Sequence, residues 1–402
     1  MKVVLSFLVV VLLMGSWVMA QNQPSSAQVD PQVVNAVDGL LAAFETHDVV
    51  AIGEQHGIAE LGHLYQALLR DPRFPEIVDA VVLEYGNARY QDLVDRYMNG
   101  EDVPYQELRQ VWNDAVGRIP GGTEVMYVQL YSTLRAVNQT LPEGERIRVL
   151  LGDPPINWSS VTTLDDVLPY QLSRESHFAE VVIHEVLDQG LKALVIIGAP
   201  HLDRSDPSEM PTLPTNAASD TQIDLPPQTG VMQQIVETAY PRATFVAVVH
   251  TGFVEDECNA EIEARMAAWQ QPALAYVHGS WIEQISCTKF PAPIFITPGT
   301  VGQGDQMMGA PNMLPLDGNA PPVSIPPMQA LPSMITQADA YLYVGNRDDL
   351  TMSPFEPAIY LDMDYFSETS RRHEVMMGTP LEWSRVAQDN PYRYVDNFPA
   401  QQ

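Results

Sequence analysis

Short apolar runs alternate with helix-like patterns along most of the chain. The apolar runs are rich in valine, isoleucine and leucine and cover residues 49–52, 80–83, 147–151, 193–197, 245–249 and 340–344. Runs of this length are typical of strands buried on both faces, as in a parallel sheet. Helix-like patterns lie between them at residues 59–69, 90–98, 126–137, 177–188 and 230–239. The alternation predicts an α/β fold with a mostly parallel central sheet flanked by helices.

Two proline-rich stretches interrupt this alternation. Residues 202–229 contain five prolines, and residues 291–334 are richer still in proline, glycine and methionine. Each stretch follows a strand candidate, so we expect either lids over the carboxyl edge of the sheet or surface loops without function. We expect one α/β domain over residues 45–370, with a lead-in at 21–44 and a tail at 371–402.

The first twenty residues have the layout of a secretory signal. Lys2 precedes an apolar run over residues 3–14, and the small-residue pattern Val18-Met19-Ala20 precedes a polar stretch. This pattern predicts cleavage after Ala20 and a secreted or periplasmic protein. The alternative is an uncleaved anchor, because the run approaches spanning length. Later residues contain no apolar segment long enough to span a bilayer, so we expect no membrane association after signal removal.

Acidic residues greatly outnumber basic ones. The chain has 51 Asp and Glu against 21 Lys and Arg, which gives a formal net charge of −30. Polyanions would be repelled, so this charge argues against a nucleic acid partner. A hydrophobic share of 46% is enough to form a sizeable core. We expect a small-molecule substrate or ligand, and the sequence leaves the oligomeric state open.

The two cysteines, Cys258 and Cys287, are the whole thiol inventory. An even number of cysteines in an oxidising compartment favours one disulfide over two free thiols. The acidic run at residues 255–257 is a poor environment for a reactive thiolate, and two thiols alone make a poor zinc site. We therefore expect a structural bridge between them.

Candidate functional residues follow the strand candidates at their carboxyl ends, where open α/β sheets bind ligands. The first strand leads into Gly53-Glu54-Gln55-His56, the second ends at Glu84, and the fourth leads into Gly198-Ala199-Pro200-His201. Glycine allows a sharp turn at such a point, and the carboxylates and imidazoles project from it. Two Gly-x-x-His motifs at matching strand ends predict a shared site.

These motifs resemble the superfamily that joins erythromycin esterases, ChaN-like haem-binding proteins and Tiki/TraB proteins. The resemblance rests on the two Gly-x-x-His motifs, the strand at residues 81–84 that ends in Glu84, and the late segment 338–345. The Glu-x-His spacing is closest to the ChaN-like branch, and His63 is similar to an extra histidine of that branch. The arginine typical of the esterase branch has no clear counterpart, Arg70 being the nearest.

The resemblance implies a pocket formed by Glu54, His56, Glu84 and His201. In it, His56 would act as general base, and Glu54 or Glu84 would orient the ring or the attacking water. His201 would stabilise the developing oxyanion or protonate the leaving group. The implied reaction is hydrolysis of an ester, lactone or amide, and no Gly-x-Ser-x-Gly motif for a serine nucleophile occurs.

Two other functions remain open for the same pocket. His56, Glu84 and His201 are candidates to hold a divalent metal that generates hydroxide, as Tiki-like relatives suggest. The ChaN-like branch suggests haem or another ligand bound without catalysis. Candidate ligands for haem are Tyr65, Tyr85, His63 and the methionine-rich stretch at residues 291–334. A non-catalytic secreted protein that only contacts other proteins is a third possibility.

Three further residues are candidates for substrate binding, each with a structural alternative. Arg89 either clamps an anionic group or pairs with Asp92 or Glu54. Asp153, which precedes two prolines, is either a site residue or a turn residue. His63 lies on the expected apolar face of a helix and is either a ligand-binding residue or a packing histidine.

The four pocket residues have structural interpretations too. Glu54 and His56 are also able to form a hydrogen-bonded pair that closes a strand end. Glu84 fits an acid at a helix N-terminus, and His201 fits an ordinary loop residue. The two matching motifs favour the functional interpretation.

Overall fold

The computed structural model describes residues 29–117, 123–204, 231–250, 256–285, 334–356 and 358–381. The signal-like segment, Cys287 and nearly all of the two proline-rich stretches lie outside these ranges, so the expectations about them stay predictions. No helix in the described ranges is both long enough and apolar enough to cross a membrane.

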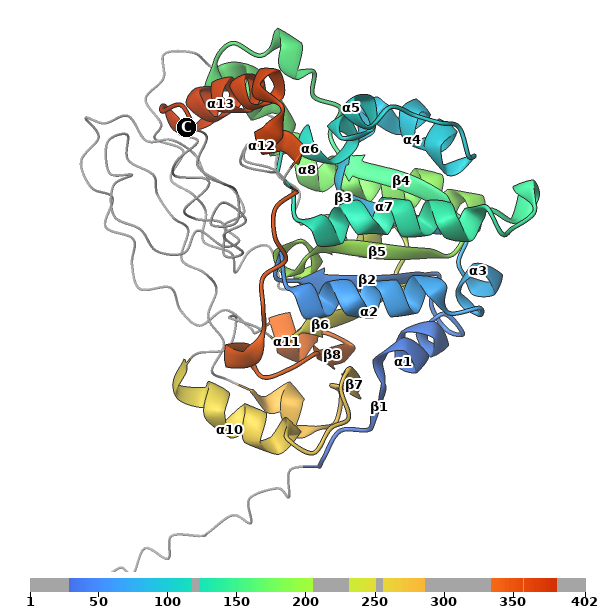
Figure 1. Cartoon of the computed structure of the whole chain (residues 1–402). Coiled ribbons are helices and arrows are strands. Elements are labelled where there is room, and N and C mark those ends of the chain that lie inside the picture. Colours follow the sequence, from blue (N-terminus) through green and yellow to red (C-terminus); the bar gives the residue numbers. More distant parts are fainter. Residues whose placement is uncertain are drawn as a thin grey trace, which may run out of the picture.

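One eight-stranded sheet forms the centre of the molecule, with the strand order β1-β7-β8-β6-β2-β5-β3-β4 (Figure 1). The strands are β1 (Val33–Asn35), β2 (Val49–Glu54), β3 (Ala80–Asn87), β4 (Arg148–Asp153), β5 (Ala193–Gly198), β6 (Thr244–Val249), β7 (Ala273–Tyr276) and β8 (Ala340–Tyr343). All pairings are parallel except those of β7 with β1 and β8. The predicted α/β class is confirmed, and each predicted apolar run contributes a strand. The short strands β1 and β7 were not predicted.

Helices cover both faces of this sheet. They are α1 (Ala36–Ala43), α2 (Ala59–Arg70), α3 (Phe74–Ile77), α4 (Gln91–Met98), α5 (Tyr105–Leu108), α6 (Gln110–Asn113), α7 (Val125–Asn138), α8 (Leu164–Glu185), α9 (Met232–Ala239), α10 (Asp256–Met266), α11 (Met334–Gln337), α12 (Ala358–Leu361) and α13 (Met363–Met377). Residues of α1, α2, α4, α6 and α7 belong to one core cluster, and residues of α8 to α11 belong to the other.

Strand β2 shows why the predicted runs are continuously apolar. Val50 and Ile52 join the first core cluster, whereas Val49 and Ala51 join the second. Successive side chains of a strand point to opposite faces of the sheet. Because both faces are covered by helices, every position along the strand is buried and favours an apolar residue.

The register of the sheet brings the polar strand ends together. Glu54 of β2 is level with Gly198 of β5, and Leu83 of β3 is level with Ile196 of β5. A register shift follows Leu83 in the pairing of β3 with β4. The residues after these levels therefore emerge at one carboxyl edge of the sheet.

A strap of residues 351–356 crosses that edge on its way from β8 to α12 and α13 (Figure 1). Its Met352 forms an antiparallel bridge with Ile58, which follows β2, and its Phe355 forms one with Glu124, which precedes α7. The amide of Ser353 donates to the carbonyl of Gly57 at 2.7 Å. The strap thus ties the turn after β2 to the start of α7.

The packed domain extends beyond its expected limits of residues 45–370 at both ends. Strand β1 and helix α1 fall in the expected lead-in, yet Ala36 and Leu40 are fully buried in the core. Helix α13 continues past residue 370, and its Arg372 is buried. The helix pattern at residues 177–188 corresponds to the second half of α8, which begins at Leu164. The start of this helix is capped by a hydrogen bond of 2.9 Å from the backbone N–H of Thr163 to the Asp166 carboxylate.

Candidate functional site

Glu54 and His56 form a hydrogen-bonded pair at the end of β2. The His56 Nδ1 atom lies 2.8 Å from Glu54 Oε1. Two buried tyrosines hold the same carboxyl group: the Tyr127 hydroxyl donates to Oε1 at 2.5 Å and the Tyr65 hydroxyl donates to Oε2 at 2.5 Å. With Glu54 as an acceptor from every side, the proton of the neutral imidazole sits on Nδ1, and Nε2 is left for chemistry.

Gly57 shapes the turn that carries His56. Its φ of +83° lies in the left-handed region, where a side chain is strained. Its amide donates to the Tyr127 hydroxyl at 3.1 Å, and its carbonyl accepts from the strap. A Cβ atom at this position would lie 2.5 Å from the methyl carbon of Met352. The left-handed backbone is what requires glycine here, because the Met352 methyl group is the end of a flexible side chain and is able to move.

Glu84 lies between the two predicted histidines. Its Oε2 is 3.6 Å from His56 Nε2, and its Oε1 is 3.5 Å from His201 Nε2. Direct hydrogen bonds reach it from the Arg174 guanidinium at 3.0 Å and from the amide of Gly198 at 2.7 Å. Both imidazoles thus face one buried carboxylate.

Electrostatics keep this carboxylate ionised. Burial alone would raise the pKa of Glu84. The side chains of His56, His201 and Arg174 outweigh burial and hold the pKa of Glu84 well below its usual value. Glu84 is therefore an anion across the physiological range.

His201 is the outer partner of a second histidine–carboxylate pair. Its Nδ1 lies 2.7 Å from Glu175 Oε1, and the other oxygen of Glu175 accepts from the Met232 amide at 2.8 Å. Burial opposes protonation of this ring, but Glu175 and Glu84 together raise the pKa of His201 to about 10. His201 is an imidazolium at neutral pH.

His56 differs from these neighbours in its access to solvent. Its side chain is 23% exposed, against 6% for Glu84 and 4% for His201. Burial lowers the tendency of the ring to protonate, yet the carboxylates of Glu84 and Glu54 outweigh it and raise the pKa of His56. His56 is thus the member of the cluster best placed to exchange a proton with a bound molecule.

Arg174 of α8 connects the cluster to β4. Its Nε donates to Asp153 Oδ1 at 2.8 Å, and the second oxygen of Asp153 accepts from the amides of Val116 and Gly117. Burial would lower the pKa of the Arg174 guanidinium, but the negative charges of Asp153 and Glu84 outweigh burial and raise this pKa. Burial raises the pKa of Asp153 despite the adjacent arginine.

The glycine of the second Gly-x-x-His motif makes room for the first histidine. A Cβ atom at Gly198 would lie 3.0 Å from His56 Nε2 and 3.4 Å from Glu84 Oε2. A side chain here would push the ring away from the carboxylate. Gly198 is therefore needed for close approach, while its own φ of −57° is ordinary.

The donor set does not fit the alternative of a divalent metal held by His56, Glu84 and His201. Both ring nitrogens of His201 already face carboxylates, Nδ1 at 2.7 Å from Glu175 and Nε2 at 3.5 Å from Glu84. Glu84 is already paired with Arg174, whose positive charge would repel a cation. Within the described ranges, no group of three or more His, Cys, Asp or Glu side chains is arranged to hold a metal ion.

The structure brings together all four residues of the predicted pocket. Of the predicted substrate-binding residues, Asp153 reaches the cluster, but only through Arg174. Arg89 is exposed on a short 3-10 turn. His63 is exposed on α2, so its expected place on the apolar face was wrong. The neighbouring Tyr65 turns inward instead.

Arg174, Glu175 and Tyr127 are members of the cluster that the sequence analysis missed. Arg174 and Glu175 precede the helix pattern expected at residues 177–188, and Tyr127 looked like any aromatic residue of a helix core. The sequence offered only an indirect indication of Arg174. A buried carboxylate at a strand end, such as Glu84, requires a cationic partner, and an arginine is a suitable one.

A separate buried histidine, His250, follows β6. Its Nδ1 lies 2.5 Å from the Tyr341 hydroxyl, and its Nε2 lies 3.1 Å from Glu263 of α10. Burial lowers the pKa of His250, so the ring is neutral. These contacts join α10 to β6 and β8, and His250 makes none of the contacts of the Glu84 cluster described above.

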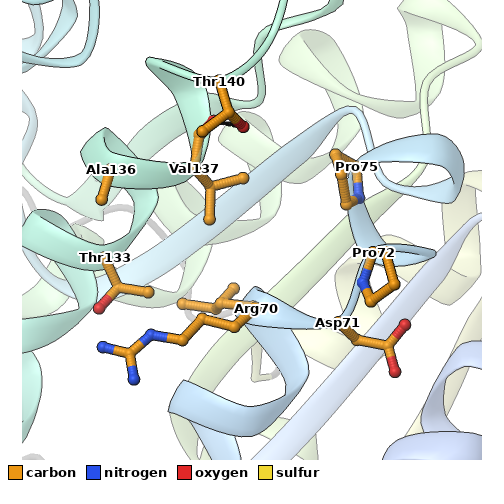
Figure 2. Close-up of a pocket in the computed structure, with 9 residues that line it drawn as sticks. Arg70, Asp71, Pro72, Pro75, Thr133, Ala136, Val137 and Thr140 are labelled. Atoms are coloured by element: carbon orange, nitrogen blue, oxygen red, sulfur yellow. Dashed lines mark hydrogen bonds between the residues drawn. The ribbon is translucent and has the colours of Figure 1, made fainter.

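A surface cavity of about 310 Å³ lies at the other end of α2 (Figure 2). Its walls come from the segment that ends α2 and leads into α3, and from the second half of α7. They include Arg70, Pro72, Pro75, Thr133 and Val137. Arg70 thus lies on this cavity and not at the Glu84 cluster, where the cation that contacts Glu84 is Arg174.

Fold and site together define an α/β protein in which two histidine–carboxylate pairs meet at one buried glutamate. No family model matches the chain, and no curated protein matches it. The chain is similar to a Bacillus cereus protein of solved structure, with 10% identity and a TM-score of 0.44 over 79% of this chain and 95% of that chain.

Two further solved structures are similar over a little more than half of the chain. The type III effector HopBA1 has 15% identity and a TM-score of 0.35 over 57% of this chain and 89% of that chain. ChaN of Campylobacter jejuni, solved with cofacial haem, has 13% identity and a TM-score of 0.34 over 55% and 88%. At such scores these likenesses carry no argument about function. The resemblance to erythromycin esterases and Tiki proteins stays a prediction.

Proposed function

We propose that the protein is an exported hydrolase that cleaves an ester, lactone or amide at the Glu54–His56–Glu84 cluster. The observation that carries this proposal is the 2.8 Å bond from His56 Nδ1 to a carboxyl group that two tyrosines also hold. This arrangement fixes the ring and its tautomer, as a general base requires. The same ring is the accessible member of the cluster.

In the proposed reaction, neutral His56 takes a proton from water at Nε2 while the water oxygen attacks the substrate carbonyl. The bond to the leaving group then breaks, and the leaving group takes the proton back from the imidazolium. Glu84 Oε2, 3.6 Å from Nε2, is close enough for one water molecule to contact both atoms. The Glu84 anion also stabilises the imidazolium that forms in the transition state.

The burial of His201 favours a supporting role over the direct contact with substrate that the resemblance implied. Its Nε2 faces Glu84, and its Nδ1 is committed to Glu175. Together with Arg174 it keeps Glu84 charged although this carboxylate is buried. We therefore assign proton transfer to His56 alone, and assign His201 and Arg174 to holding Glu84 in place.

A panel of p-nitrophenyl esters and lactones, assayed with and without a chelator, tests this proposal. We expect turnover in the parent protein that the chelator leaves unchanged. We expect a loss of about 10²-fold or more in kcat/KM in His56→Ala, since general base catalysis contributes about 10²–10⁴-fold. His63→Ala is the matched control, because it removes an exposed imidazole from the adjacent helix.

Full activity in folded His56→Ala, or an equal loss in His63→Ala, contradicts the assignment. Glu84→Gln adds a second arm, with circular dichroism as the check on folding because its carboxylate is buried among charged groups. A chelator-dependent rate in the parent would restore a metal mechanism. N-terminal sequencing of the secreted protein tests export and cleavage after Ala20.

Haem titration tests the ChaN-like alternative of ligand binding without catalysis. Of the candidate axial ligands, Tyr65 is fully buried and bonded to Glu54, and Tyr85 is also buried. His63 is exposed. We expect no saturable Soret shift. A stoichiometric shift lost in His56→Ala would replace the hydrolase proposal with haem binding at the same site.

A further inference from the structure

Arg174 reaches Glu84 from a helix, and a loop closes over it from the other side. A Cβ atom at Gly117 would lie only 2.0 Å from the Arg174 guanidinium, so the backbone of this residue packs directly on the charged group. The preceding residue, Val116, donates its amide to Asp153 and accepts at its carbonyl from Gln171 at 2.8 Å. The segment 114–117 therefore seats the arginine between its two carboxylates.

This segment is fixed at its first residue, Asp114, which is almost fully buried. The Trp158 indole and the Asn87 side-chain amide both donate to its carbonyl, at 2.8 Å and 3.0 Å. Its carboxylate accepts from the Tyr90 hydroxyl at 2.8 Å and pairs with Arg372. A single buried carboxylate thus joins the segment to α13.

Arg372 is held as firmly on its own side. It is buried on α13, and its Nε donates to Glu368 one turn earlier at 2.7 Å. Its guanidinium also lies 5.2 Å from the centre of the Trp158 ring. Buried ion pairs contribute little to stability relative to apolar replacements. The Asp114–Arg372 pair therefore suits a role in fixing the position of the 114–117 segment better than a role in overall stability.

We propose that Asp114 and Arg372 are positioning residues for the site, because their ion pair holds the 114–117 segment that seats Arg174 against Glu84. Helix α13 then stabilises the geometry of the site through Arg372, although it contacts none of the reacting groups. The part of this inference that concerns catalysis rests on the proposed function, whereas the part that concerns the charge around Glu84 does not.

The test compares the parent chain with Arg372→Met and with the double variant Asp114→Asn/Arg372→Met. Methionine keeps much of the volume, and the second substitution avoids a buried carboxylate without a partner. Arg96→Met is the matched control, because Arg96 forms an exposed pair with Glu101. The His56 imidazole is titrated by NMR, with His56→Ala used to assign its signal among the nine histidines.

We expect the pH midpoint of His56 to rise by about one unit in the double variant, because an Arg174 that is no longer held against Glu84 neutralises this carboxylate less. We expect Arg96→Met to leave it unchanged. With a turned-over ester, the double variant should lose about tenfold in kcat at nearly constant KM, and the alkaline shift should appear in its pH profile.

An unchanged His56 midpoint in the folded double variant overturns the proposal, and so does an equal shift in Arg96→Met. Failure of both Arg372 variants to fold would show that the Asp114–Arg372 pair is needed for overall stability, and this result also overturns the proposal. If the parent hydrolyses no ester or lactone, only the proposed function fails, since the titration does not depend on turnover.

Discussion

Replacing Gly198 with alanine adds one methyl group at the centre of the proposed site. The new carbon would lie 3.0 Å from His56 Nε2 and 3.4 Å from Glu84 Oε2. The backbone N–H that donates to Glu84 is retained, and the φ of −57° suits alanine. The substitution therefore changes one thing, which is the space between the imidazole and the strand.

The size of the effect follows from what has to move. Overpacking costs about 1–3 kcal/mol of unfolding free energy. The ring of His56 is 23% exposed and able to give way, so we expect about 1 kcal/mol, or a Tm lower by about 2–4 °C. A displacement of about 1 Å at a reacting group costs about 10²-fold in rate, so a shift of a few tenths of an ångström should cost about tenfold.

The assay is kcat/KM on the best ester or lactone, with thermal denaturation alongside. Gly144→Ala is the matched control: Gly144 is exposed, and no atom beyond its two chain neighbours lies within 4 Å of the Cβ position. We expect Gly198→Ala to lose activity out of proportion to its small loss of stability, and Gly144→Ala to lose neither. Activity within twofold of the parent in folded Gly198→Ala would refute a role for His56 Nε2 at this place.

Three further predictions follow from the same contacts. Tyr65→Phe removes a 2.5 Å donor from buried Glu54 and should cost about 1–3 kcal/mol in urea unfolding; an unchanged midpoint would show that Glu54 does not depend on this hydroxyl. Because the pKa of His56 is raised, kcat/KM should climb with pH to a plateau above neutrality, and a maximum at acidic pH would contradict general base action. His201 has a folded pKa of about 10 against 6.5 in the unfolded chain, so its stabilisation is complete below pH 6.5 and is lost as pH rises towards 10; thermal melts should show this decline, and it should vanish in His201→Gln.

The sheet and its polar edge were predictable because they depend on local pattern. Strands buried on both faces have a continuous apolar sequence, and the residue after such a run must emerge at the carboxyl end. Glu54, Glu84 and His201 were found in this way without any knowledge of strand order. The strand order places β5 between β2 and β3 and so brings these three ends together.

The partners of these residues were not predictable on the same basis. Arg174 and Glu175 lie on a helix, where any of several turns might face the sheet, and the crossing of α8 over β4 decides which does. The expected orientation of α2 was wrong for His63, because the buried stripe of the helix passes through Leu61, Tyr65 and Leu68 instead. Successive residues of a helix point about 100° apart, so an error of one residue in the predicted buried face turns an expected buried ligand into a surface residue.

The carboxylates of the site are held by specific partners. Glu84 pairs with Arg174, and the largely covered Glu175 pairs with His201. Buried Glu54 is held instead by the hydroxyls of Tyr65 and Tyr127. Charges taken out of water must be paired or hydrogen-bonded in this way, whereas exposed carboxylates need no partner. The net charge of −30 is summed over the whole chain, and it says nothing about the sign of the substrate. What the buried pairs do constrain is protonation: with Glu84 fixed as an anion and His201 as a cation, the one ring left to exchange protons near neutral pH is His56.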